Sequence, residues 1–355
     1  MTLSKEMLDM LVCPLCKGDL TLKTDAGVTD KSLYCGQCDL QYDVENGIPI
    51  MLPPELRIHS EQMKASGSLS VKWANIDLYV NREKERDKWE NQPGKRLWLP
   101  RLLDFTFRYL DKPNGKVLDA GCGVGMLSSY LSDRGFKPTC FDISKDCITA
   151  VRKDDLRLKN SVVADAEHMP FRDHSFNGVC FLGSLHHLPN AKKGLSEAFR
   201  VLKNGGRAIL IENNSRRTGI MAEIITITLK LILQPNLGMK ELVLAYKKLF
   251  AKVSKQNIIE YQGRKYKRDS TGRWIIIGET DQEITIPYVL NLAKMTGFKV
   301  LDVRTQQILI TLATFYKKDI SYRTRGRLQR IDRLLLERIP ILNKYGDQML
   351  VALEK

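Results

Sequence analysis

Residues 117–127 read VLDAGCGVGML, which is an apolar strand-like run, a turn with a glycine at every second position, and the start of a helix-like segment. Glycines in such a turn let the backbone approach a bound nucleotide closely. Gly121, Gly123 and Gly125 follow the spacing G-x-G-x-G, whereas dinucleotide sites favour G-x-G-x-x-G. The stretch predicts a nucleotide site and leaves the nucleotide open.

The chain around this turn alternates strand-like and helix-like segments. The strand-like runs are KVLDAGCG, PTCFDIS, SVVADA, NGVCFLGSL and RAILIEN, with helical patterns such as LSSYLSDRG and KKGLSEAFRVLKN between them. Strict alternation predicts an α/β fold, a Rossmann-like doubly wound parallel sheet with helices on both faces and its ligand at the carboxyl ends of the strands.

Acidic residues at the strand ends help to choose the ligand. Asp119, at the end of the first strand, would repel a pyrophosphate but suits a cationic cofactor such as S-adenosylmethionine. Asp142 ends the next strand and could accept both ribose hydroxyls in either kind of site. Asp165 and Ala166 follow the third strand, where they could hold the adenine edge. For Asp165 a helix-capping role is the alternative.

Five pieces of sequence carry a family resemblance: LDAGCGVG, FDIS, ADAEHMPF, LGSLHHLPN and SEAFRVLKNGGRAILIE. In this order they resemble the class I S-adenosylmethionine-dependent methyltransferases, over residues 116–212. The resemblance implies a methyltransferase that uses S-adenosyl-L-methionine. It also implies a set of cofactor-binding residues: Asp119, Gly121, Gly123, Gly125, Asp142, Ile143, Asp165, Ala166 and Gly183.

Four of the eight cysteines form two C-x2-C pairs separated by 18 residues, namely Cys13, Cys16, Cys35 and Cys38. This spacing predicts a four-thiolate, structural Zn²⁺ site with no open position for catalysis; buried or redox-active thiols are the alternative. LVCPLCKGDL, YCGQC and QYDVENGIPIML resemble the Trm112-like zinc-ribbon family over residues 5–53. Stand-alone members of that family dock onto methyltransferases and stabilise them.

These observations divide the chain into a zinc ribbon at 5–53, a helical linker at 54–112 and a methyltransferase domain at 113–355 with insertions at about 214–285 and 311–346. The net charge is +15, and 11 of these excess charges lie in two segments, residues 213–285 and 316–340. Because both insertions should emerge on the substrate side of the sheet, we expect an anionic substrate or an anionic surface that presents it.

Methyl transfer from a sulfonium is an in-line displacement that needs alignment more than a strong base. If a base is used, His187 is the first candidate and His186 the second, because both follow the fourth strand at its cofactor end. The alternative is that these side chains only pack or cap.

Two classes of function remain open. In the first, the acceptor is an anionic small molecule, glycan or lipid-linked compound; in the second, the protein is an RNA base methyltransferase, acting on rRNA or tRNA, that grips RNA with its ribbon and insertions. No apolar run is long enough for a transmembrane segment and the N-terminus lacks a signal-peptide layout, so we expect a cytoplasmic protein, with peripheral membrane contact through the insertions left open.

Overall fold

The computed structural model describes residues 3–24, 31–56, 95–110, 112–214, 258–261, 264–268, 274–277, 284–306 and 348–355, together with single residues at 327, 330, 331, 334 and 338. Most of the expected linker and most of both insertions lie outside these residues.

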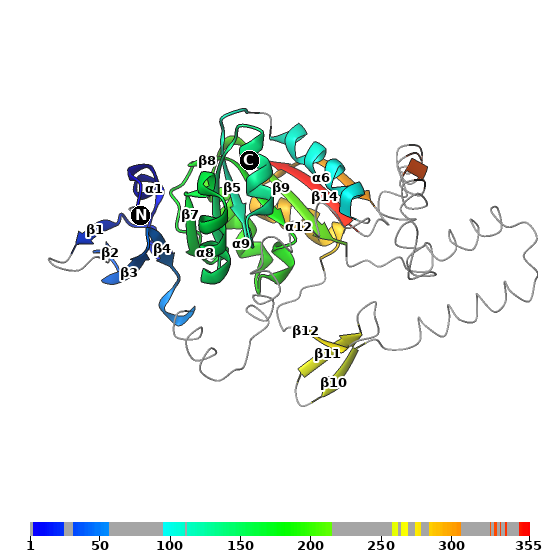
Figure 1. Ribbon diagram of the computed structural model, residues 1–355. Helices are drawn as coiled ribbons and strands as arrows, with labels where there is room; N and C mark the ends of the chain where they lie inside the picture. Colours follow the sequence, from blue (N-terminus) through cyan, green and yellow to red (C-terminus); the bar gives the residue numbers. More distant parts are fainter. Residues whose placement is uncertain are drawn as a thin grey trace, which may run out of the picture.

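An eleven-stranded sheet forms the centre of the molecule, in the order β1-β2-β3-β4-β7-β6-β5-β8-β9-β14-β13 (Figure 1). The strands after the ribbon are β5 (Lys116–Ala120), β6 (Lys137–Asp142), β7 (Ser161–Ala164), β8 (Phe176–Leu182), β9 (Leu202–Asn213), β13 (Lys299–Gln306) and β14 (Gln348–Glu354). Strands β7, β6, β5, β8 and β9 run parallel, whereas β14 is antiparallel to both β9 and β13. The predicted doubly wound α/β sheet is confirmed.

Helices cover both faces of the sheet because alternate side chains of each buried strand point to opposite faces. Helix α6 (Lys95–Tyr109) and helix α7 (Met126–Asp133) share one apolar cluster, while α9 (Ala191–Val201) and α12 (Ile286–Thr296) share another. Helix α8 (Lys145–Asp154) packs on β6 and β7, and its first turn is capped by Ser144, which accepts from the Cys147 amide.

One helix is shorter than the sequence pattern suggests. KKGLSEAFRVLKN reads as helical throughout, but α9 ends at Val201 and β9 begins at Leu202. The difference follows from strand pairing, since Leu202 lies opposite Phe176 at the start of β8. A sheet partner outweighs local helix preference at this point.

The N-terminal ribbon contains α1 (Lys5–Met10), β1 (Thr21–Thr24), β2 (Lys31–Cys35), β3 (Leu40–Glu45) and β4 (Ile48–Met51). Its last strand, β4, pairs parallel with β7, with Ile50 opposite Val163 and Met51 opposite Ala164. The ribbon therefore extends the central sheet at the edge beyond β7, on the left in Figure 1. We call this junction of ribbon and sheet the seam.

The apolar core also crosses the seam. Tyr42 and Leu33 of the ribbon are fully buried, and they belong to the same cluster as Phe171 and Val179 of the methyltransferase-like part. A short antiparallel bridge between Leu11 and Phe171 adds a second backbone connection. Shared burial of this kind makes the ribbon part of the fold rather than an appended module.

The first insertion contributes a separate antiparallel sheet of β10 (Ile258–Tyr261), β11 (Arg264–Arg268) and β12 (Trp274–Ile277). The basic run RKYKRDSTGRW thus spans β11 and the start of β12. Among the described residues, no helix has the length and apolar character needed to cross a bilayer.

Candidate cofactor site and metal centre

The glycine turn joins β5 to α7 in a left-handed backbone conformation. The φ angles of Gly121, Gly123 and Gly125 are 70°, 52° and 74°, which other residues rarely adopt. The amides of Gly121 and Cys122 both donate to the carbonyl oxygen of Phe141 on β6, at 3.0 Å each. The turn is therefore held against the carboxyl end of the neighbouring strand.

Two glycines of the expected cofactor-binding set border open space. A Cβ atom added to Gly121 would lie 2.6 Å from the Ser184 Cβ, so this glycine is needed for close packing. By contrast, a Cβ at Gly123 or at Gly183 would meet no atom within 4 Å. Both of these positions belong to the expected cofactor-binding set, and they leave room for a ligand beside the strand ends.

Asp142 fastens the glycine turn to the start of α8. Its Oδ2 accepts from the Gly123 amide at 2.9 Å, and its Oδ1 accepts from the Ser144 amide at 2.9 Å. Burial raises the pKa of the Asp142 carboxyl, while these amides and the nearby His187 oppose the rise. Each carboxylate oxygen has two lone pairs, so Asp142 can still accept hydroxyl groups. Ile143, the next residue, is partly buried against the apolar cluster of β4.

Asp119 is buried beneath α7, with 1% of its surface exposed. Its Oδ2 accepts from the Ser128 hydroxyl at 2.7 Å, and Cys140 and Cys180 lie opposite it on the two neighbouring strands. Burial among these groups raises the pKa of the Asp119 carboxyl to about 6. The side chain anchors the helix that follows the glycine turn.

Asp165 and Ala166, 2% and 7% exposed, lie just past the carboxyl end of β7. The Asp165 Oδ1 accepts from the Glu167 amide at 3.3 Å, and its Oδ2 lies 2.8 Å from the His168 Nδ1. Asp165 thus caps the turn that follows it. This is close to the helix-capping role considered as the alternative, although no helix begins there.

The two candidate bases lie in a single 3-10 turn, Leu185–His187, with their ring centroids 3.9 Å apart. His186 Nδ1 is 2.6 Å from the Glu212 Oε2 on β9. The other oxygen of Glu212 accepts from the Ser184 and Leu185 amides at 3.1 and 2.8 Å. Glu212 is not among the site residues expected from the sequence, although its position at the carboxyl end of β9 is a signal that could have identified it.

The four expected zinc ligands come together. The four sulfur atoms all lie within 4.8 Å of one another; they belong to Cys13, Cys16, Cys35 and Cys38. The Cys13–Cys38 and Cys16–Cys35 sulfur distances are 4.0 and 3.5 Å. A zinc tetrahedron with arms of about 2.3 Å has edges of about 3.8 Å, so this arrangement fits zinc closely.

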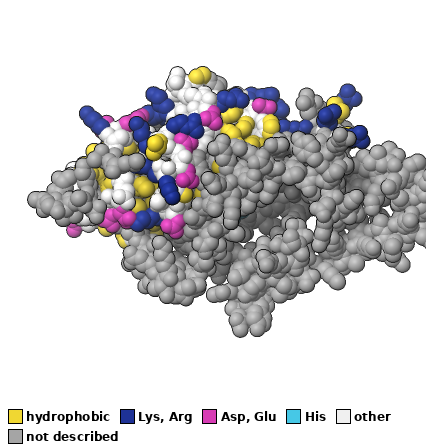
Figure 2. All heavy atoms as spheres, viewed as in Figure 1, with side chains coloured by type: hydrophobic (Ala, Val, Ile, Leu, Met, Phe, Trp, Pro, Cys, Tyr) yellow, Lys and Arg dark blue, Asp and Glu magenta, His cyan; other side chains and the backbone are white. Residues whose placement is uncertain are grey.

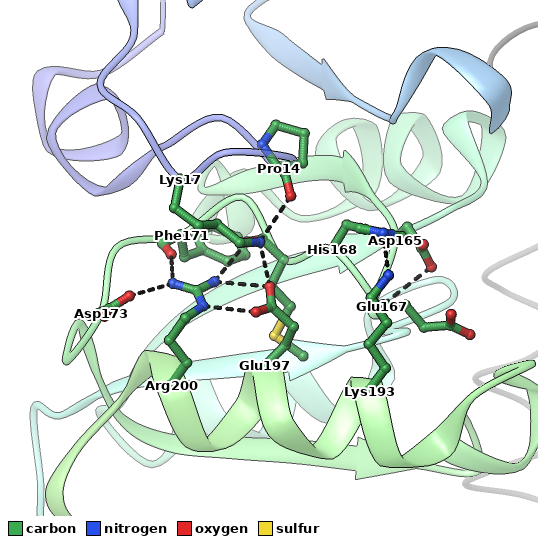
Figure 3. A network of polar contacts seen from close by, with 11 residues as sticks. Pro14, Lys17, Asp165, Glu167, His168, Phe171, Asp173, Lys193, Glu197 and Arg200 are labelled. Atoms are coloured by element: carbon green, nitrogen blue, oxygen red, sulfur yellow. Dashed lines mark hydrogen bonds and ion pairs between the residues drawn. The ribbon is translucent and has the colours of Figure 1, made fainter. Parts of the chain in front are cut away.

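The first cysteine turn also contacts the methyltransferase-like part, as Figure 3 shows. Lys17 Nζ donates to Glu197 Oε2 on α9 at 2.6 Å and to the Met169 carbonyl at 3.2 Å. Arg200, one helical turn beyond Glu197, pairs with it and with Asp173. The sequence did not reveal this cluster of charges.

Comparisons with known proteins agree with the two modules. Residues 118–210 match a family described as a methyltransferase domain, and residues 4–47 match one described as Trm112p-like protein. The chloroplastic tocopherol O-methyltransferase of Arabidopsis thaliana is 36% identical over 118 residues, 31% of this chain and 34% of that protein. A ubiquinone/menaquinone biosynthesis C-methyltransferase of Bartonella quintana is 34% identical over 107 residues, 28% of this chain and 41% of that protein.

The chain thus spans less than half the length of these curated relatives. A solved chain from a complex described as the Haloferax volcanii Trm112 methyltransferase activator and a putative methyltransferase has 15% identity and a TM-score of 0.46, covering 79% of this chain and 96% of that one. The cysteine quartet and the glycine turn fall within the two matched segments. The chain therefore combines, in this order, a segment at 4–47 that matches the Trm112p-like family and a segment at 118–210 that matches the methyltransferase-domain family.

Proposed function

We propose that the protein transfers a methyl group from S-adenosyl-L-methionine to an anionic small-molecule, glycan or lipid-linked acceptor. The observation that carries this proposal is the space beside Gly123 and Gly183, next to the Asp142 carboxylate. It supports a ligand that meets bare backbone and an acceptor-only side chain together, as the methionine and ribose parts of this cofactor would.

Different residues of the chain would then bind different parts of the cofactor. Asp142 accepts the ribose hydroxyls, Asp165 and Ala166 border the adenine, and the glycine turn lies along the methionine part. Asp119 adds negative potential beneath a positively charged ligand. The cofactor itself supplies the methyl group on a sulfonium, which is a good leaving group.

Glu212 changes the order of the candidate bases. A carboxylate at the His186 Nδ1 favours the tautomer with its proton on that nitrogen, and this leaves the lone pair on Nε2. We therefore place His186 first, as a base oriented by Glu212, and His187 second, beside Asp142. The cofactor-binding residues and the two candidate bases would then meet at the turn that holds both histidines.

The acceptor class rests on charge and on the relatives. On the face in Figure 2, Lys and Arg side chains of the described residues are interspersed with Asp and Glu, and most of the excess positive charge falls in the two insertions. The relatives named above act on tocopherol or in quinone biosynthesis. The relatives favour a small or lipid-linked acceptor over RNA. The charge of the insertions favours an anionic acceptor and would suit RNA equally.

Two measurements test this function. Calorimetric titration should show binding of S-adenosyl-L-methionine and S-adenosyl-L-homocysteine and none of NAD; a preference for NAD would overturn the proposal. Asp142→Ala should lose this binding while the protein keeps its fold. Transfer of labelled methyl groups to a cell extract, separated into lipid, water-soluble and RNA fractions, identifies the acceptor class; label in RNA alone would refute the acceptor assignment.

A further inference from the structure

Three polar side chains form a chain at the end of the predicted adenine site, as Figure 3 shows. Lys193, exposed on α9, reaches the His168 Nε2 with its Nζ. The His168 Nδ1 in turn lies 2.8 Å from the Oδ2 of Asp165, whose side chain is 3% exposed. A surface ammonium group is thus linked through one imidazole ring to a buried carboxylate.

The chemistry of these groups fixes where the protons lie. An ammonium group can only donate, so the His168 Nε2 accepts. The proton of the neutral ring is then on Nδ1, from which it is donated to Asp165. A hydrogen bond from the ring supports the ionised form of this carboxylate.

The backbone of the same turn is held as well. The His168 amide donates to the Asp165 carbonyl at 3.0 Å, and Glu167 Oε1 accepts from the Asn190 amide at 2.9 Å. On the other side of the turn, Lys17 of the ribbon bonds the Met169 carbonyl. The Asp165 carboxylate itself is held by the Glu167 amide at Oδ1 and by the His168 ring at Oδ2, so it acts as an oriented acceptor.

We propose that His168 is a positioning residue that makes the cofactor site specific for adenine, by holding Asp165 as an oriented acceptor. The proposal rests on the proposed function, in which Asp165 borders the adenine. Adenine carries a 6-amino donor, whereas hypoxanthine carries a 6-oxo acceptor at the same position. A fixed carboxylate attracts the first and repels the second, so its orientation determines the selectivity of the site.

The experiment compares S-adenosyl-L-homocysteine with S-inosyl-L-homocysteine by calorimetric titration. The wild-type protein should prefer the adenosine compound by roughly 10- to 100-fold, which corresponds to one hydrogen bond to a charged group. His168→Leu removes the donor and should reduce this preference at least about fivefold. His168→Asn places an amide donor near the former Nδ1 and should keep the preference within about twofold.

Other outcomes overturn the assignment in distinguishable ways. An unchanged preference in His168→Leu would show that the ring does not set specificity, and an equal loss in His168→Asn would show that the ring acts by packing rather than by donation. If the wild-type protein bound neither compound, the proposed function itself would fail. Melting temperature and zinc content, measured for each variant, separate loss of selectivity from loss of fold.

Discussion

Lys17 Nζ lies 2.6 Å from Glu197 Oε2, and this ion pair links two residues 180 positions apart. One side chain leaves the first cysteine turn of the ribbon, and the other comes from α9. The Lys17 and Glu197 side chains are only 28% and 13% exposed, so the pair is shielded from water. A partly buried ion pair therefore links the first cysteine turn of the ribbon to α9.

Removal of Lys17 should weaken the whole fold. Lys17→Met leaves Glu197 partly buried with Arg200 as its remaining cation, and we expect the free energy of unfolding to fall by about 1–3 kcal/mol. The matched control is Lys145→Met, which breaks an exposed ion pair with Glu45 across the same seam and should cost less than about 0.5 kcal/mol. Urea unfolding measures both, and equal losses would refute the special role of Lys17.

The cysteine quartet should hold one zinc ion per chain, measured by mass spectrometry of the metal. Cys35→Ser removes a fully buried ligand and should lose the metal and lower the melting temperature, because metal binding is coupled to folding. Cys147→Ser, which changes a buried thiol outside the quartet, should keep the metal. A native protein that is stable without metal would contradict the assignment.

Two alanine variants in the glycine turn should lose different properties, one mainly stability and the other mainly cofactor binding. In both, a residue with a Cβ in the left-handed conformation should lower the free energy of unfolding by about 1–2 kcal/mol. Gly121→Ala also clashes with Ser184 and should therefore be the less stable of the two in urea. Gly123→Ala places its methyl group in open space, so it should fold well yet bind S-adenosyl-L-homocysteine at least about tenfold more weakly. Normal binding by Gly123→Ala would show that the cofactor does not occupy that space.

The buried Asp119 predicts how cofactor affinity depends on pH. With a pKa of about 6 in the free protein, this carboxyl is largely protonated at pH 5.5 and ionised at pH 7. A positively charged ligand favours the ionised form, so affinity for S-adenosyl-L-methionine should rise through this range, by at most about tenfold per pH unit, and level off above it. Asp119→Asn should flatten the dependence; an identical slope in the variant would assign the titration to another group.

Glu212 should matter for turnover and not for cofactor affinity. Glu212→Gln leaves a hydrogen-bonding group for the Ser184 and Leu185 amides but removes the charge that orients His186. We expect the rate of methyl transfer to the labelled fraction to fall by about 10- to 100-fold with S-adenosyl-L-homocysteine binding unchanged. His186→Asn should behave in the same way. A larger loss in His187→Asn would transfer the role of base to that residue.

The sequence was sufficient for features that depend on local pattern. The alternation of strands and helices around 117–127 predicted the sheet, because hydrophobic periodicity and glycine turns are local signals. The spacing of the four cysteines likewise predicted their meeting in space, since each C-x2-C turn presents two sulfur atoms together. The locations of Asp142 and Asp165 at strand ends followed from the same pattern.

Features that depend on distant partners were not visible. The IPIM stretch of β4 looks like any short apolar strand, and nothing in SVVA marks β7 as the strand that accepts it. The contact of Lys17 with Glu197, and that of His186 with Glu212, needs the three-dimensional fold to bring the partners together. Pairing across such distances has no periodic signature in a single sequence.

The seam has a consequence for how the protein behaves on dilution. Two separate chains joined by so short a parallel pairing would lose about 4–15 kcal/mol of translational and rotational freedom each time they met. Here both partners belong to one chain, so docking is a first-order event with a fixed effective concentration. The fraction of molecules whose ribbon is docked on the sheet should consequently be the same at nanomolar and at micromolar protein concentration.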